Sequence, residues 1–199
     1  MKGLIEADEN LLMAINGAHS EFMDFVMFWV SDKFIWIPLY VVFVAMIVSK
    51  KGVKSAFIYL LFIILTIWAT DQTCCTVIRP LVERLRPCAA DNPISPMIHS
   101  VIGSRYGTFG FPSAHAANTF ALAMFLSLLF RKKWLTCLLF LWAFMVSYSR
   151  VYLAAHYPGD ILAGFMVGGI YALAFFYVAS YLQEHNFALN PWLKRNRQL

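Results

Sequence analysis

Charged residues are scarce in this sequence. Asp, Glu, Lys and Arg make up 14% of its 199 residues, whereas hydrophobic side chains make up 60%. A soluble globular domain has about 25% charged and about 45–50% apolar residues. The shortage of charge therefore argues against a soluble enzyme and predicts an integral membrane protein. The length suits one all-α domain, a helical bundle of five to six transmembrane helices.

Other common features are also missing. The four cysteines have no metal-type spacing; Cys74 and Cys75 end an apolar run and are interpreted as packing residues, and the redox state of Cys88 stays open. No basic region precedes an apolar core with a cleavage site, so we expect no cleaved signal peptide. The net charge of +5 comes from basic residues near helix ends, which indicates membrane orientation and not a nucleic-acid partner.

The N-terminal part is expected to lie at the membrane interface. Apolar residues recur at helical spacing over residues 4–19 with acidic residues between them, a pattern typical of an amphipathic interfacial helix. Residues 22–30 are apolar but short, and they favour a re-entrant or tilted segment; whether they cross the membrane is left open. We therefore treat residues 1–33 as interfacial or re-entrant helices.

Five longer apolar runs predict membrane helices within a core of residues 34–183. Most of them are close to the lower limit of about 17 residues for a span. Residues 184–199 form the predicted cytoplasmic tail. The runs are residues 34–49, 55–70, 113–130, 134–149 and 161–183.

Basic clusters predict the orientation of these runs. They lie at residues 50–54, at 131–133 and in the tail at Lys194, Arg195 and Arg197. With five spans all three fall on one face, which the positive-inside rule makes cytoplasmic. The loops 71–112 and 150–160 then share the extracytoplasmic face.

Those outer loops carry three charged patches. Arg79 and Arg86 are seven residues apart, so two helical turns would place them on one face, although Pro80 favours a kink or a new helix start. Arginine is well suited to bidentate phosphate contacts. The simpler interpretation is a solvated ladder of ion pairs with Glu83, which contributes little.

The second patch opens the third long run. Ser113 is a good helix cap, and the helix N-terminus at Ala114 offers backbone N–H groups to an anion. His115 lies in that first turn. A lone histidine there is more often structural, but beside a phosphate it is a candidate general acid.

The third patch contains Arg150, His156 and Asp160. A carboxylate four residues after His156 can accept one imidazole proton and leave the other nitrogen free as a nucleophile. Asp160 can also complement the dipole of the helix that it begins, and both interpretations can hold. Ionisable groups gathered in a membrane bundle indicate a functional site.

Together the patches resemble the three-part signature of the type 2 phosphatidic acid phosphatase superfamily, in its membrane-bound bacterial branch. The chain departs from it in two places: the family usually has lysine at the position of Arg79 and glycine at that of Ala114. The matching segments are Arg79-x6-Arg86-Pro87, Pro112-Ser113-Ala114-His115 and Ser149-Arg150-x5-His156-x3-Asp160.

The resemblance implies hydrolysis of a lipid phosphate without metal or cofactor. His156 is the implied nucleophile, Asp160 orients it and His115 protonates the leaving oxygen. The implied substrate is undecaprenyl diphosphate, phosphatidylglycerophosphate or a lipid A phosphate, in a cytoplasmic membrane with the site facing the periplasm or exterior. The implied phosphate-binding residues are Arg79, Arg86, Ser113, Ala114 and Arg150.

Alternatives remain at this point. A membrane anion transporter needs polar groups near the midplane, and the apolar runs are almost free of charge. A haloperoxidase shares the signature, but the many spans argue against it. An inactive relative that only binds lipid phosphate would not need the catalytic residues His115, His156 and Asp160. All three are present in this sequence. The sequence does not predict the oligomeric state.

Overall fold

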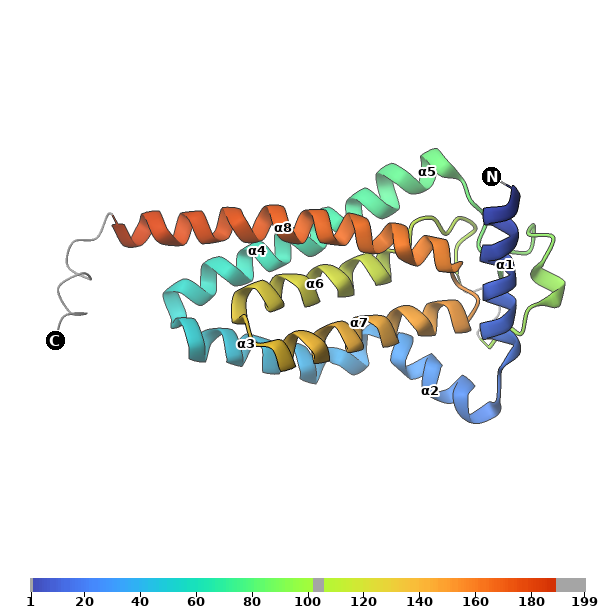
Figure 1. Ribbon diagram of the computed structural model, residues 1–199, viewed down its shortest axis with the longest axis horizontal. Helices are drawn as coiled ribbons and strands as arrows, with labels where there is room; N and C mark the ends of the chain where they lie inside the picture. Colours follow the sequence, from blue (N-terminus) through green and yellow to red (C-terminus); the bar gives the residue numbers. More distant parts are fainter. Residues whose placement is uncertain (1, 102–105, 189–199) are drawn as a thin grey trace.

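The computed structural model describes residues 2–101 and 106–188, and these form an elongated helical bundle (Figure 1). Within that part of the chain there is no strand, only an isolated bridge between Leu85 and Phe109. The all-α prediction is therefore confirmed. The elements are α1 Lys2–Gly17, α2 Glu21–Ser31, η1 Lys33–Trp36, α3 Ile37–Lys51, α4 Val53–Gln72, η2 Thr73–Ile78, α5 Arg79–Val82, η3 Ser95–Met97, α6 Ala114–Phe130, α7 Lys133–Tyr152 and α8 Pro158–Ala188.

Five helical segments can form the membrane core. Four are long and apolar enough to cross a bilayer, and α6 is a shorter apolar helix of 17 residues. At 1.5 Å per residue the 11 residues of α2 extend roughly 16 Å, about half of the hydrocarbon thickness of about 30 Å. α2 is therefore too short to span alone. The four segments are Lys33–Lys51, Val53–Val82, Lys133–Tyr152 and Pro158–His185.

The outward faces of these helices are apolar. Phe57, Ile64, Met166 and Ile170 each expose more than 60% of their surface. A soluble protein of this size rarely presents such a continuous apolar surface, whereas lipid tails cover it at no cost. The molecule is an integral membrane protein.

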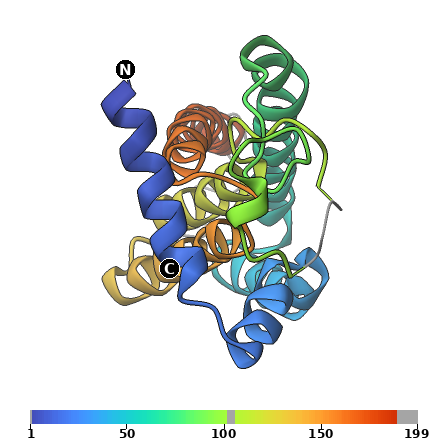
Figure 2. The same cartoon turned by 90° about the vertical axis from the view of Figure 1, so that its right-hand side faces the viewer.

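The bundle has two different ends. At one end Lys50 Nζ donates to Phe130 O over 3.0 Å, so the α3–α4 and α6–α7 turns with their basic clusters lie together. The third cluster, Lys194 to Arg197, lies outside the described residues. At the opposite end α1 runs across the helix ends and not along them (Figures 1 and 2). α8 continues to Ala188, past the predicted end of the span at residue 183.

One prediction about the first patch is wrong. Arg79 and Arg86 do not share a helix face, because the helix ends at Val82 and Glu83 adopts a left-handed conformation with φ of 50°. Pro80 lies in the first turn of α5, as the expected helix start at this proline predicts, although α5 continues the segment that begins with α4. A π-helical stretch, Thr73–Ile78, precedes it, and its wider turn accommodates a proline that cannot donate a helical hydrogen bond.

The cysteines are free thiols. Cys74 is fully buried beside Ala114 and Ala117, as the packing interpretation predicts, and Cys75 is half-buried against that cluster. Cys88 is also buried and unpaired in a disulfide. Cys74, Cys75 and Cys88 therefore contribute packing and not cross-links, whereas Cys137 is exposed on α7.

Glycines bring α8 onto the backbone of α6. A Cβ added at Gly164 would lie 2.6 Å from the Ser113 carbonyl oxygen, and one at Gly168 would lie 2.2 Å from that of Ala117. Small residues allow such close approach between membrane helices. The contact matters for function because it fixes the start of α6 against the start of α8.

Replacing Gly168 with alanine is expected to lower the free energy of unfolding by about 2–3 kcal/mol, because the added methyl group has no room against the Ala117 carbonyl. The measurement is thermal unfolding of the purified protein in detergent. Gly169→Ala is the matched control, since its nearest neighbour is Phe120 Cε1 at 3.5 Å, an ordinary contact. Equal melting temperatures for the two variants would contradict the packing argument.

Candidate active site

The third patch lies where α7 ends and α8 begins. Ala155 N and His156 N both donate to Arg150 O, over 3.0 and 3.3 Å, and Ala154 turns the chain with a left-handed φ of 53°. This compact turn places Arg150, His156 and Asp160 together in the interior. His156 exposes 1% of its surface and Asp160 none.

The tautomer of His156 follows from its contact with Arg86. His156 Nε2 lies 2.9 Å from Arg86 Nη1. A guanidinium only donates hydrogen bonds, so Nε2 is the accepting nitrogen and the ring proton is on Nδ1. Nδ1 faces Asp160 Oδ2 at 3.5 Å. At this separation Nδ1 makes no hydrogen bond within the described residues, so the structure places Asp160 next to the ring and its orienting role stays a prediction.

The surroundings of His156 favour a neutral imidazole. Burial and the nearby positive charges of Arg86, Arg150 and Arg79 hold the pKa of His156 well below its usual value of 6.5. At neutral pH the Nε2 lone pair is therefore not blocked by a proton. A buried imidazole in this state is able to act as a nucleophile.

Asp160 is held by residues that sequence reasoning did not place in the site. Arg84 Nη1 donates to Asp160 Oδ1 over 2.8 Å, and Tyr157 N donates to Oδ2 over 3.0 Å. Arg84 Nη2 also donates to Asp8 Oδ2 over 2.6 Å, and Asp8 Oδ1 accepts from Gly159 N over 2.7 Å. Asp8 was interpreted only as part of the polar face of α1. The N-terminal helix therefore reaches the same carboxylate as the histidine.

The arginines of the first and third patches converge. Arg79 Nη2 donates to Pro112 O over 3.3 Å, and Arg86 Nη1 donates to Ala155 O over 2.8 Å. Arg150 Nη1 donates to Ser31 Oγ and, over 3.3 Å, to Tyr106 Oη.

These arginines still have unused donors. The buried Nε atoms of Arg79, Arg86 and Arg150 have no hydrogen-bond partner in the part of the chain that the structure describes. Buried polar groups are normally satisfied, so three convergent unpaired donors point to an absent acceptor.

The positive charge of the site also indicates that it binds an anion. Burial and the positive charges of Arg79 and Arg150 lower the pKa of Arg86 to about 10. Within the described residues none of Arg79, Arg86 and Arg150 forms an ion pair, and the neighbouring Asp160 pairs with Arg84. An anion with several oxygens, such as a phosphate, supplies both the negative charge and the acceptors.

The second patch is joined to the third through the backbone. Ser113 caps α6 as predicted, because its Oγ accepts from Ala116 N over 3.4 Å. Ser113 N donates to Asp160 O over 3.0 Å, so the start of α6 lies beside the start of α8. Ala114 is the first residue of α6 and is buried. Arg79, which donates to Pro112 O, reaches the backbone two residues before Ala114.

Gly110 is a further residue that the sequence did not single out. A Cβ there would lie 2.9 Å from Arg86 Cγ, 3.4 Å from Asp160 Oδ2 and 3.5 Å from His156 Nδ1. Gly110 N donates to Arg84 O over 2.9 Å, which holds this loop against the arginines. The absence of a side chain lets the loop close over the histidine and its carboxylate.

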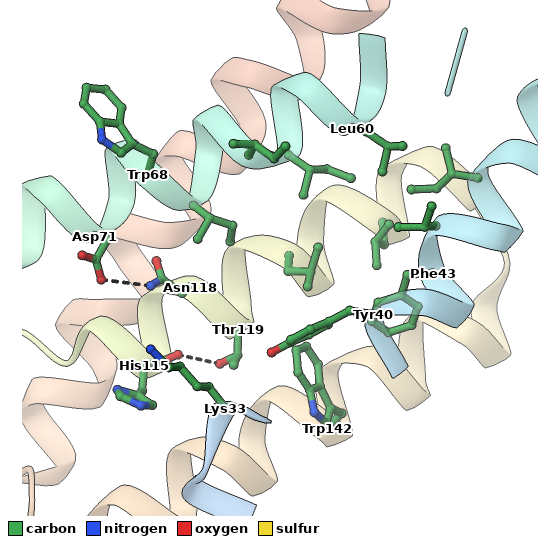
Figure 3. Close-up of a pocket in the computed structure, with 17 residues that line it drawn as sticks. Lys33, Tyr40, Phe43, Leu60, Trp68, Asp71, His115, Asn118, Thr119 and Trp142 are labelled. Carbon is green, nitrogen blue, oxygen red and sulfur yellow. Dashed lines mark hydrogen bonds between the residues drawn. The ribbon is translucent and has the colours of Figure 1, made fainter. Parts of the chain in front are cut away.

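His115 faces an elongated cavity of about 700 Å³ between α3, α4 and α6 (Figure 3). Lys33, Asp71, Asn118 and Thr119 lie with His115 at one end, where Asn118 Nδ2 donates to Asp71 Oδ1 over 3.2 Å. The rest of the lining is apolar, and part of it is also exposed on the outer surface of the bundle. The apolar lining comprises Tyr40, Phe43, Val44, Ile47, Leu60, Ile63, Ile64, Ile67, Trp68, Leu122, Leu126 and Trp142.

Comparisons with known proteins agree with this geometry. Residues 55–184 match the family model of the PAP2 superfamily. The chain is 46% identical over 176 residues to a lipid A 4'-phosphatase of Bacteroides thetaiotaomicron, covering 88% of this chain and 78% of that protein. It is 30% identical over 168 residues to a lipid A 4'-phosphatase of Porphyromonas gingivalis, covering 84% and 71% of the two chains.

A solved structure supports the same assignment. The crystal structure of the first transmembrane PAP2 type phosphatidylglycerolphosphate phosphatase from Bacillus subtilis superposes with a TM-score of 0.62 at 25% identity, covering 93% of this chain and 88% of that one. The family match covers all three charged patches, and the converging arginines and histidine lie inside it. The chain belongs to the PAP2 superfamily and is a bacterial membrane-bound lipid phosphatase.

Proposed function

We propose that the protein removes a phosphate from the head group of a bacterial envelope lipid, and that the lipid is a lipid A carrying a 4'-phosphate. The observation that carries the proposal is the cluster of unpaired buried arginine donors beside His156. Arg86 and Arg150 also interact electrostatically with His115, which lines the polar end of an apolar cavity. The identity to lipid A 4'-phosphatases over most of the chain supports the choice of lipid.

In the proposed reaction His156 Nε2 attacks phosphorus and displaces the sugar oxygen. The P–O bond to the lipid breaks as the P–N bond of a phosphohistidine forms, and His115 gives its proton to the leaving oxygen. Water then attacks phosphorus, His115 accepts a proton from it, and inorganic phosphate leaves. The neutral state of His156 and the proton position on Nδ1 support this role.

The other residues have electrostatic roles in the proposal. Arg79, Arg86 and Arg150, with Ser113 and the Ala114 N–H, bind the phosphate oxygens and stabilise the charge that develops in the transition state. On phosphate binding Arg86 leaves His156 Nε2 and turns its donors to the substrate. Asp160 orients the ring and stabilises the imidazolium that forms. No step requires a metal ion or a cofactor.

The cavity suggests how a lipid is placed. Acyl chains fit its apolar length, while the head group lies at the end with Lys33 and His115. The basic turns at the opposite end of the bundle favour a cytoplasmic location for that end. The site then faces the periplasm, in the cytoplasmic membrane.

The direct test is phosphate release from a panel of lipids by detergent-purified protein in EDTA. The panel contains lipid A, phosphatidylglycerophosphate, undecaprenyl diphosphate and phosphatidic acid. Mass spectrometry identifies the position from which lipid A loses phosphate. Fastest release from the 4' position supports the proposal, faster release from another lipid reassigns the substrate, and no release from any lipid refutes the enzymatic role.

A bulky side chain in the cavity is expected to affect long-chain lipids selectively. Ile67→Trp fills the apolar lining one turn from Asp71, so it should lower kcat/KM for lipid A by about 100-fold through displacement of the acyl chain. Hydrolysis of a water-soluble, short-chain phosphate ester should change little. The measurement is a comparison of kcat/KM for the two substrates.

Leu61→Trp is the matched control, because Leu61 is on the same helix, is partly exposed to lipid and does not line the cavity. It should leave both rates near those of the wild type. An equal loss of kcat/KM on both substrates in Ile67→Trp would show that the substitution damages the fold or the catalytic residues. An unchanged kcat/KM for lipid A would show that acyl chains do not occupy the cavity.

A further inference from the structure

A second cluster of ligating side chains lies outside the phosphatase site. His19 comes from the turn between α1 and α2, Asp24 from the first turn of α2, and His99 from the outer loop. One ligand atom of each lies within 4.8 Å of the others. His99 Nε2 is 2.8 Å from Asp24 Oδ2, and the rings of His19 and His99 stack with centroids 3.7 Å apart. Three separate segments therefore meet at one point.

Hydrogen bonds behind the cluster fix the backbone at His99 and the carboxylate of Asp24. Asn16 Oδ1 accepts from His99 N over 2.9 Å, and Asn16 Nδ2 donates to His99 O over 2.8 Å. Tyr152 Oη donates to Asp24 Oδ1 over 2.6 Å, which leaves Oδ2 facing the histidine. Asn16 and Tyr152 are both almost fully buried. The Tyr152 contact to Asp24 is the kind of hydrogen bond that orients a metal-ligating carboxylate.

The electrostatics of the cluster favour a divalent cation. Each imidazole can present a ring nitrogen to a metal ion, and the two rings lie 3.7 Å apart. The carboxylate beside them attracts positive charge. His99 and Asp24 are only partly exposed and His19 is exposed, so an ion can enter from the solvent and the His19 ring can turn to meet it.

We propose that His19, Asp24 and His99 bind one divalent transition-metal ion of the Zn²⁺ type, with water in the remaining position. Two imidazole nitrogens and one carboxylate oxygen suit zinc, whose bonds to such ligands are about 2.0–2.2 Å. Two such ligands on a tetrahedral ion lie roughly 3.3 Å apart, so His99 Nε2 and Asp24 Oδ2, which are 2.8 Å apart as a hydrogen-bonded pair, must separate slightly when the ion binds. The ion fastens the outer loop to the α1–α2 turn and has a structural role, outside the chemistry at His156.

Metal binding is tested directly on the purified protein, with its affinity tag removed and bound metal stripped by EDTA and gel filtration. Zn²⁺ is titrated by calorimetry at pH 7.5, and Co²⁺ is titrated by its visible absorption. We expect one ion per chain, and saturating Zn²⁺ should raise the melting temperature by roughly 5 °C. The phosphatase-inactive His156→Ala protein should bind the ion equally well.

His19→Ala is the decisive variant, because His19 is exposed and its loss should not impair folding. We expect at least a tenfold loss of Zn²⁺ affinity in His19→Ala, and a similar loss in Asp24→Asn. His185→Ala, which removes an exposed histidine near the end of α8, should bind as the wild type does. Absence of binding in the wild type, or wild-type affinity in His19→Ala, would overturn the proposal and leave His99 and Asp24 as an ion pair.

Discussion

Replacement of His156 with alanine is expected to lower phosphate release by about 10⁴-fold, the effect of losing a nucleophile whose partners remain in place. The variant retains the three arginines and should still bind the lipid phosphate. Its KM should therefore change much less than its kcat. The measurement is steady-state hydrolysis of the best lipid substrate by both proteins in EDTA.

A covalent intermediate separates this role from simple binding. Wild-type protein mixed with ³²P-labelled lipid and quenched within one turnover should carry acid-labile, base-stable label, as a phosphohistidine does. His156→Ala should carry none, and His185→Ala should label as the wild type does. Label of equal amount in His156→Ala would assign the nucleophile to another residue.

The buried surroundings of His156 predict how kcat/KM depends on pH. The pKa of His156 lies well below 6.5 because the ring is buried among arginines. The imidazole is therefore already neutral at pH 6.5 and becomes protonated only in more acidic solution. Loss of kcat/KM on acidification should begin below pH 6.5, and a midpoint at 6.5 assigned to His156 would contradict the described surroundings.

The second large effect is expected at Arg84. Arg84→Gln removes the cation that pairs with the fully buried Asp160, and breaking a buried pair is strongly destabilising for the group left behind. Misplacement of Asp160 releases the His156 ring from its orientation. We expect a fall in kcat of about 100-fold with KM nearly unchanged. The measurement is kcat and the rate of phosphohistidine formation in single turnovers.

Conservative variants show whether Arg84 acts by position. Arg84→Lys keeps the charge but can contact Asp160 and Asp8 less well together, so it should recover part of the lost rate. Asp8→Asn weakens the other side of the bridge and should reduce kcat less than Arg84→Gln. Lys54→Gln, at the opposite end of the bundle, is the control for loss of a positive charge. A raised KM in Arg84→Gln, with an unchanged rate of phosphohistidine formation, would instead place Arg84 in substrate binding.

The sequence predicted those parts of the site that depend on local spacing. His156 and Asp160 are four residues apart at a helix start, and Ser113 is the residue that caps its own helix. Periodic apolar runs likewise predicted the long helices, because hydrophobic pattern and length are local properties. These features required no knowledge of which segments pack together.

Contacts between distant segments could not be predicted in this way. Asp8 is 76 residues from Arg84 and 151 residues from Gly159, and only the folded chain brings the three together. In the sequence Gly110 resembles any turn glycine, and only the folded chain shows that a Cβ there would meet Arg86 and His156. The prediction that Arg79 and Arg86 share a helix face was wrong for a local reason, because the helix ends at Val82 and Glu83 adopts a left-handed conformation.

The lateral position of the cavity has a kinetic consequence. Val44, Ile64 and Trp68 line it and are also exposed on the outer surface of the bundle, so under the proposed function lipid enters sideways from the membrane. The enzyme then encounters substrate by two-dimensional diffusion, and its rate depends on the mole fraction of that lipid in the leaflet and not on its bulk concentration. Dilution of the substrate with inert phospholipid should slow turnover at constant total substrate. The dephosphorylated lipid stays in the leaflet and competes for the same opening, while only inorganic phosphate escapes to water.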